Sequence, residues 1–75
     1  MDGTNVQTMK RLTPFQVKRL NLGSIVSIYD EESGDITECR LIKYGSEKRL
    51  QSLDRLHLYF RIKDNPGLVY LVEGK

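Results

Sequence analysis

Between Leu56 and Lys63, apolar and polar side chains alternate without a break, and this feature restricts the fold more than any other. Successive side chains of a β-strand point to opposite faces of its sheet, so a period of two predicts a strand with one buried face. The apolar side chains share the inward face: Leu56, Leu58, Phe60 and Ile62. The others share the outward face: His57, Tyr59, Arg61 and Lys63. We therefore expect a mostly β protein whose sheet has one side open to solvent.

Three more strands are predicted along the chain. Ser24–Tyr29 is rich in β-branched and aromatic residues, and Ile36–Tyr44 follows it after an acidic connection, which predicts a hairpin. Near the C-terminus, Pro66 and Gly67 predict a type II turn, because Pro presets the first central φ and Gly supplies a positive φ at the second. The turn leads into a last strand over Leu68–Val72.

A short helix is predicted ahead of the first hairpin. Thr13 can cap it, Pro14 occupies its first position and Gln16 completes a Thr-x-x-Gln capping box, while Gly23 acts as a stop signal. Residues 46–55 are ambiguous, because leucines at helical spacing there fit either a second short helix or an irregular loop.

The length of the chain, 75 residues, leaves room for one small domain. We expect a flexible tail over residues 1–9 and a single domain over residues 10–75. The predicted architecture is a small antiparallel sheet or a partly open barrel of about four strands. It includes the short N-terminal helix and, as one of the two options, a second short helix within residues 46–55.

Catalysis and metal binding lack the residues they need. Cys39 is the only cysteine and His57 the only histidine, so neither an internal disulfide nor a His/Cys metal cluster can form. No acid or nucleophile is placed to orient His57, and no glycine-rich phosphate loop occurs. We expect a protein that is not an enzyme and that uses no cofactor, no metal and no small-molecule substrate.

Charge is separated along the chain, although the net charge is only +2. Residues 30–38 contain five acids and no base, whereas residues 40–63 contain seven bases and two acids. The longest apolar run, Leu68–Val72, is far shorter than the roughly 20 residues that span a membrane. A lone thiol suits a reducing compartment, so we expect a cytoplasmic protein without membrane contact.

Two functions fit this pattern. The first is a regulatory or adaptor module that contacts a protein partner, or a second copy of itself, through its sheet. The last strand has apolar residues on both parities, and a sheet edge can accept a partner strand. The alternative is binding of single-stranded RNA or DNA, because exposed rings stack on bases while cations neutralise phosphates. The residues expected to make the contact are His57, Tyr59, Arg61, Lys63, Arg40 and Arg55.

One segment resembles a known family. The stretch from Leu22 to Asp30, with Ser33–Thr37 and Arg40–Ile42 after it, is similar to the opening hairpin of the C-terminal domain of bacterial transcript-cleavage factors, which docks on RNA polymerase. The resemblance covers residues 22–42, and the later part of that domain and its catalytic coiled coil have no counterpart here. It implies a polymerase-binding regulator without cleavage activity.

Overall fold

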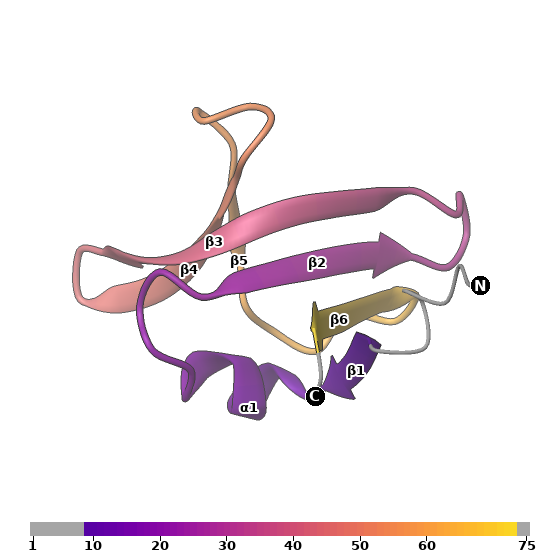
Figure 1. Ribbon diagram of the computed structural model, residues 1–75, viewed down its shortest axis with the longest axis horizontal. Helices are drawn as coiled ribbons and strands as arrows, with labels where there is room; N and C mark the ends of the chain where they lie inside the picture. Colours follow the sequence, from indigo (N-terminus) through magenta and orange to yellow (C-terminus); the bar gives the residue numbers. More distant parts are fainter. Residues whose placement is uncertain (1–8, 74–75) are drawn as a thin grey trace.

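The structure, a computed structural model, describes residues 9–73, which form one open antiparallel sheet and one short helix (Figure 1). The six strands are ordered β1-β6-β2-β3-β4-β5 across the sheet. The elements are β1 (Met9–Leu12), α1 (Pro14–Lys18), β2 (Ile25–Asp30), β3 (Ile36–Tyr44), β4 (Glu47–Ser52), β5 (Tyr59–Arg61) and β6 (Leu68–Glu73). The mostly β class is confirmed, with six strands instead of about four. The tail predicted over residues 1–9 lies outside the described residues except for Met9, which begins β1.

The predicted capping box is present at the start of α1. Thr13 Oγ1 accepts from the Gln16 N–H at 3.2 Å, and Gln16 Oε1 accepts from the Thr13 N–H at 2.9 Å. The helix ends at Lys18, well before Gly23, so it is shorter than predicted. In the described part of the chain, no helix has the length and apolarity that crossing a membrane requires.

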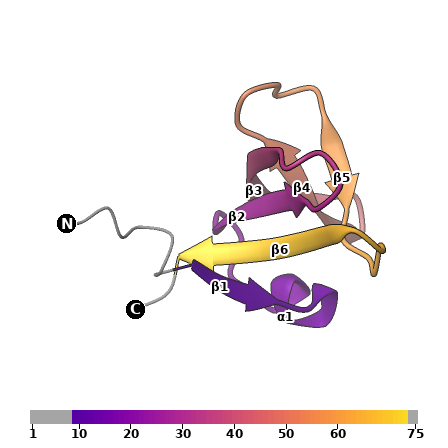
Figure 2. The ribbon, with the colours of Figure 1, turned by 90° about the vertical axis from the view of Figure 1, so that its right-hand side faces the viewer.

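The predicted hairpin and the predicted type II turn are both confirmed. β2 pairs with β3 in an antiparallel register that places Val26 opposite Cys39. At the later turn, Gly67 has a φ of +86° and the Leu68 N–H donates to the Asn65 carbonyl at 3.2 Å. This turn brings β6 back alongside β2, and β6 lies between β2 and β1 (Figure 2).

The prediction for residues 46–55 is wrong on both options, because residues 47–52 form strand β4. Gly45 and Ser46 make a two-residue turn between the paired residues Tyr44 and Glu47. Gly45 has a φ of +66° and no other residue type has a positive φ in the described chain, which corresponds to a type II′ hairpin turn. The turn reverses the chain after β3, so the segment continues the sheet and its leucine spacing has no helical meaning.

The strand predicted over Leu56–Lys63 is correct only in its centre, β5. Ser52 Oγ accepts from the Arg55 N–H at 3.0 Å, and the Leu58 N–H donates to the Arg55 carbonyl at 2.9 Å. These bonds fold residues 53–58 into a connection that projects from the sheet (Figure 1), where Leu56 is 61% exposed. Local turn bonds therefore override the alternating pattern at its start.

The core lies on one face of the sheet, which we call the inner face. Its fully buried side chains come from β2, β3 and β4 together with α1: Val26, Cys39, Leu41, Leu50, Ser52 and Val17. Tyr70 of β6 and Ile62, which follows β5, are 3% exposed and complete the cluster. The helix packs next to β1 at this side of the sheet, so the inner face is covered by the chain itself (Figure 2).

Candidate functional site

The opposite face of the sheet, which we call the open face, is exposed or half-exposed over β3, β4 and β5, whereas Ser27 and Val69 on β2 and β6 are buried there. Residues that pair across strands share a face, so the register defines its membership. On β3 from Arg40 onward, and on β4 and β5, the open face carries Arg40, Ile42, Tyr44, Glu47, Arg49, Gln51, Tyr59 and Arg61, while Ile36 and Glu38 continue it along the start of β3. Rings and cations therefore dominate this half of the face.

Two tyrosines and an arginine form a cluster there, which we call the tyrosine patch: Tyr44, Tyr59 and Arg49. The Tyr44 and Tyr59 ring centroids are 5.0 Å apart with an interplanar angle of 58°, and the Arg49 guanidinium carbon lies 4.2 Å from the Tyr44 centroid. Tyr44 is 43% exposed and Tyr59 is 40% exposed. The patch thus presents aromatic surface to solvent, held in place by aromatic and cation–π contacts.

Glu47 fixes the orientation of the arginine in this patch. Arg49 Nε donates to Glu47 Oε2 at 2.6 Å, which holds the guanidinium beside the Tyr44 ring. This hydrogen bond, followed by the positive charges of Arg49, Arg61 and Lys18, lowers the pKa of the exposed Glu47 carboxyl. The carboxylate therefore remains ionised and continues to position Arg49.

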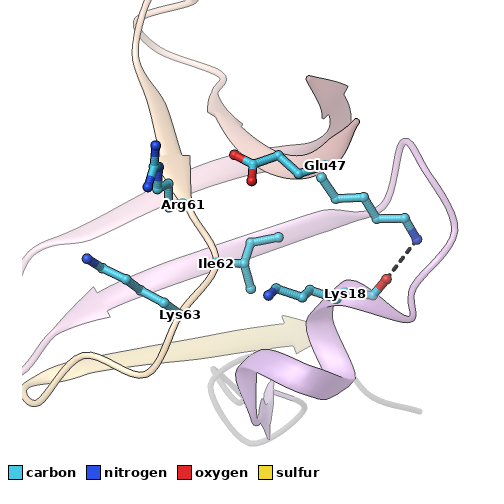
Figure 3. Close-up of a pocket in the computed structure, with 6 residues that line it drawn as sticks. Lys18, Glu47, Arg61, Ile62 and Lys63 are labelled. Carbon is cyan, nitrogen blue, oxygen red and sulfur yellow. Dashed lines mark hydrogen bonds between the residues drawn. The ribbon is translucent and has the colours of Figure 1, made fainter. Parts of the chain in front are cut away.

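A basic pocket adjoins the patch where the start of β4, the end of β5 and the end of α1 meet. It has a volume of about 380 Å³ and is lined by Lys18, Glu47, Lys48, Arg61, Ile62 and Lys63. Figure 3 shows Ile62 between Glu47 above and Lys18 below, with Arg61 and Lys63 on the other side. Four of the six lining residues are cations, and the single acid is already bonded to Arg49.

Lys48 has a structural role in this pocket. Its Nζ donates to the carbonyl oxygens of Lys18 at 2.7 Å and Leu20 at 3.2 Å, which lie at and just beyond the end of α1. A lysine in this position satisfies those carbonyls and complements the negative end of the helix. Lys48 thereby ties α1 to β4 and keeps Lys18 beside the strand residues of the pocket.

Tyr70 holds the other wall of the pocket. Its hydroxyl donates to the Lys63 carbonyl at 3.1 Å and accepts from the Lys63 N–H at 3.3 Å. Because Tyr70 is buried in the central part of β6, these bonds attach the segment after β5 to the core. The backbone that carries Arg61 and Lys63 is therefore fixed although both side chains are exposed.

The acidic residues lie at the opposite end of β3. This strand runs from Ile36, next to the acidic turn, to Tyr44, next to the tight turn before β4. Nine strand residues span roughly 26 Å. A second cavity of about 510 Å³ near the acidic end is lined by Asp35, Glu38, Asp54 and Arg55 among others. The charge separation of the sequence is thus also a separation in space.

The structure brings together some of the predicted contact residues and separates others. Tyr59, Arg61 and Arg40 lie on the open face, and Lys63 lines the basic pocket. His57 and Arg55 lie in the connection between β4 and β5 and do not share the strand face predicted for His57. The prediction omits Tyr44, although its parity on the second strand, opposite to that of Cys39, could have indicated an outward side chain.

Cys39 is fully buried in the core. Burial raises the pKa of the Cys39 thiol to about 11, so the reactive thiolate is scarce at neutral pH. Within residues 9–73, no group of three or more His, Cys, Asp and Glu side chains is arranged to hold a metal ion.

Comparison with protein-family models, with curated proteins and with solved structures gives no match to this chain. The resemblance of residues 22–42 to transcript-cleavage factors therefore gains no support from these comparisons.

Proposed function

We propose that the protein binds single-stranded nucleic acid across the open face of β3, β4 and β5. The observation that carries this proposal is the tyrosine patch beside the basic pocket, because a single strand offers flat bases and charged phosphates side by side. We propose no catalytic step. We also propose that the protein is cytoplasmic, because its single cysteine, Cys39, is a free thiol.

The arrangement of the patch suits stacking. A base can stack on the exposed surface of Tyr59 or against the Arg49 guanidinium, as bases do on aromatic rings and arginine planes. Neither contact reads the edge of a base, so we expect weak sequence preference. Arg40, in the same cross-strand row as Gln51 and Tyr59, extends the positive surface along the sheet.

The main reason to expect a protein partner is that the last strand has apolar residues on both of its faces, and the folded chain weakens this reason. The apolar surplus of β6 is largely used internally, since Val69 and Tyr70 are both buried although they point to opposite faces. Val69 is 6% exposed and Tyr70 is 3% exposed, so neither side chain offers surface to a partner. This is why we place nucleic acid ahead of protein contact.

The test is a titration of fluorescent oligonucleotides at several salt concentrations, with the variant Tyr59→Ala with Arg61→Ala beside the wild type. We expect the wild type to bind at low salt and its affinity to fall as the salt concentration rises. The protein's cations release salt cations from the phosphates on binding, and this release is less favourable at high salt. The double variant should bind at least about tenfold more weakly, since stacking contributes roughly 1–3 kcal/mol per base.

The matched control is His57→Ala with Arg55→Ala, which also removes one ring and one cation but from the connection between β4 and β5. We expect this control to bind like the wild type. Absence of binding at low salt, or equal losses in the two double variants, would contradict the proposal.

A second candidate, contact with a protein or with a second copy of the chain, is favoured by a different part of the open face. Ile36 is 59% exposed and Ile25 is 45% exposed, and a small cavity of about 190 Å³ lies beside Ile25, Leu71 and Met9. Light scattering after size exclusion, across a range of concentrations, tests self-association. A mass that stays monomeric, in a protein that retains no partner in a pull-down, would remove this candidate.

A further inference from the structure

We infer that the basic pocket binds the terminal phosphate monoester of the strand that lies on the tyrosine patch. The inference rests on the proposed function, and it assigns to the pocket a preference for phosphorylated ends that the patch alone cannot supply.

The positive charge of the pocket is available to a ligand. Lys18 comes from α1, and Arg61 and Lys63 come from the end of β5 and the segment just after it. None of the three forms an ion pair with another described residue. Lys48 is occupied by the helix carbonyls and Glu47 by Arg49. The pocket therefore has three cations whose N–H groups are free to bind a ligand. Its one carboxylate, Glu47, is already bonded to Arg49.

The number of cations matches a phosphate monoester better than an internal phosphodiester. A terminal phosphate carries a charge of about −1.5 to −2 at neutral pH and has three acceptor oxygens. An internal phosphodiester carries a single negative charge and has only two free oxygens. Charge-assisted hydrogen bonds from ammonium and guanidinium groups are among the strongest that proteins make. Three cations around one group can each find an oxygen of a monoester.

The walls of the pocket are fixed before any ligand binds. Lys48 ties the end of α1 to β4, and the Tyr70 hydroxyl ties the Lys63 backbone to β6. Ile62, which is 3% exposed, forms an apolar floor between the charged side chains (Figure 3). A fixed pocket loses little conformational entropy on binding, which favours recognition of one compact group.

The pocket and the patch are continuous. Arg61 lines the pocket and pairs across the strands with Arg49, whose guanidinium lies over Tyr44. Glu47 lines the pocket and is the cross-strand partner of Tyr44. A phosphate in the pocket therefore places the first base of its strand next to the tyrosine patch.

The test compares oligothymidylates of one length that carry a 5′-phosphate, a 3′-phosphate or hydroxyls at both ends, each with an internal fluorophore. We expect one of the two phosphorylated ends to bind about tenfold more tightly than the hydroxyl ends, the equivalent of about one charge-assisted hydrogen bond. Inorganic phosphate should compete with that oligonucleotide and reduce its advantage.

The decisive variant is Lys18→Ala with Lys63→Ala, which removes two cations from the pocket and leaves the patch intact. It should lose the preference for a phosphorylated end while it still binds the hydroxyl-ended oligonucleotide. Lys10→Ala with Lys43→Ala removes the same charge from positions outside the pocket lining and should keep the preference.

The possible failures are distinct. If no oligonucleotide binds, the proposed function is wrong and the inference falls with it. If all three oligonucleotides bind equally, or if the preference survives in Lys18→Ala with Lys63→Ala, only the inference is overturned. A phosphoserine peptide that binds more tightly than either phosphorylated oligonucleotide also overturns it, because the pocket would then serve a protein ligand.

Discussion

The two faces of the sheet carry different kinds of side chain on the same three strands. On the inner face, Leu41 and Leu50 are paired across β3 and β4 and are fully buried. On the open face of those strands and β5, Tyr44 and Tyr59 keep two-fifths or more of their surface exposed. Because alternate residues serve opposite faces, substitutions one position apart should separate folding from binding.

The largest effect is expected on the inner face, from Leu50→Ala. Truncation of a fully buried leucine removes apolar contacts and leaves a cavity, so we expect the free energy of unfolding to fall by about 3–4 kcal/mol. Urea denaturation followed by circular dichroism measures the change.

The neighbouring Gln51→Ala, whose side chain lies on the open face, is the control. Gln51 Nε2 donates to the Leu56 carbonyl at 2.8 Å, and the loss of this exposed bond should cost no more than about 1 kcal/mol. If Leu50→Ala and Gln51→Ala lowered the free energy of unfolding equally, the inner face would contribute no more to stability than the open face.

The next effect uses Cys39, which is buried on the inner face between Val26 and Ser52 in the register. Burial raises the pKa of its thiol from 9.0 to about 11, so the native state keeps its proton at a pH where the unfolded chain has lost it. The contribution of the protonated Cys39 thiol to the stability of the native state is full below pH 9.0 and is lost as pH rises towards about 11. We expect the free energy of unfolding to fall by about 2 kcal/mol over this range from Cys39 alone.

Tyrosines and lysines also titrate at alkaline pH, so the measurement needs the variant Cys39→Ala as its reference. The contribution of Cys39 is the difference between the pH dependences of the wild type and the variant. Parallel curves from pH 9.0 to about 11 would mean that the thiol is not desolvated in the native state.

The sequence predicted the elements whose signals are local. The capping box of Thr13 and Gln16, the β2–β3 hairpin and the turn at Gly67 are each set by residues within a few positions of one another. The signal for β4 is also local, because Gly45 and Ser46 are a pair typical of a type II′ hairpin turn, but it competes with a helical pattern. The leucines that follow then matched a helix as well as they matched a strand.

The candidate site was only partly predictable for a related reason. The alternation correctly placed Tyr59 and Arg61 on an outward face, but it could not show which side chains of other strands lie beside them. Tyr44 and Tyr59 lie on β3 and β5, which β4 separates, so their contact depends on the twist of the sheet and not on local spacing. The pocket also requires α1, whose position depends on the bonds from Lys48 to its end, and nothing in local spacing predicts those bonds.

A smaller effect is expected from Tyr70→Phe, which keeps the ring on the inner face and removes only the hydroxyl. Lys63 then loses two hydrogen bonds, and we expect the free energy of unfolding to fall by about 1 kcal/mol. Hydrogen exchange of the Lys63 amide should accelerate more than that of the β2 amides, because the opening is local. Unchanged exchange at Lys63 would show that the hydroxyl does not hold the pocket wall.

The smallest effect on stability is expected from Arg40→Gln, an exposed substitution on the open face between the tyrosine patch and the acidic end of β3. It should change the free energy of unfolding by less than about 0.5 kcal/mol, because no buried group loses a partner. Oligonucleotide affinity should nevertheless fall about two- to threefold and become less dependent on salt, since one phosphate contact is lost.

Arg40 provides the narrowest separation of folding from binding, because its neighbour Cys39 on the same strand lies in the core. Glu38, two residues away on the open face, limits the gain from any phosphate bound at Arg40, which is why the expected loss is small. Glu38→Gln should therefore strengthen oligonucleotide binding while Arg40→Gln weakens it. If both variants bind like the wild type, the bound strand ends at the tyrosine patch and does not extend towards the acidic end of the sheet.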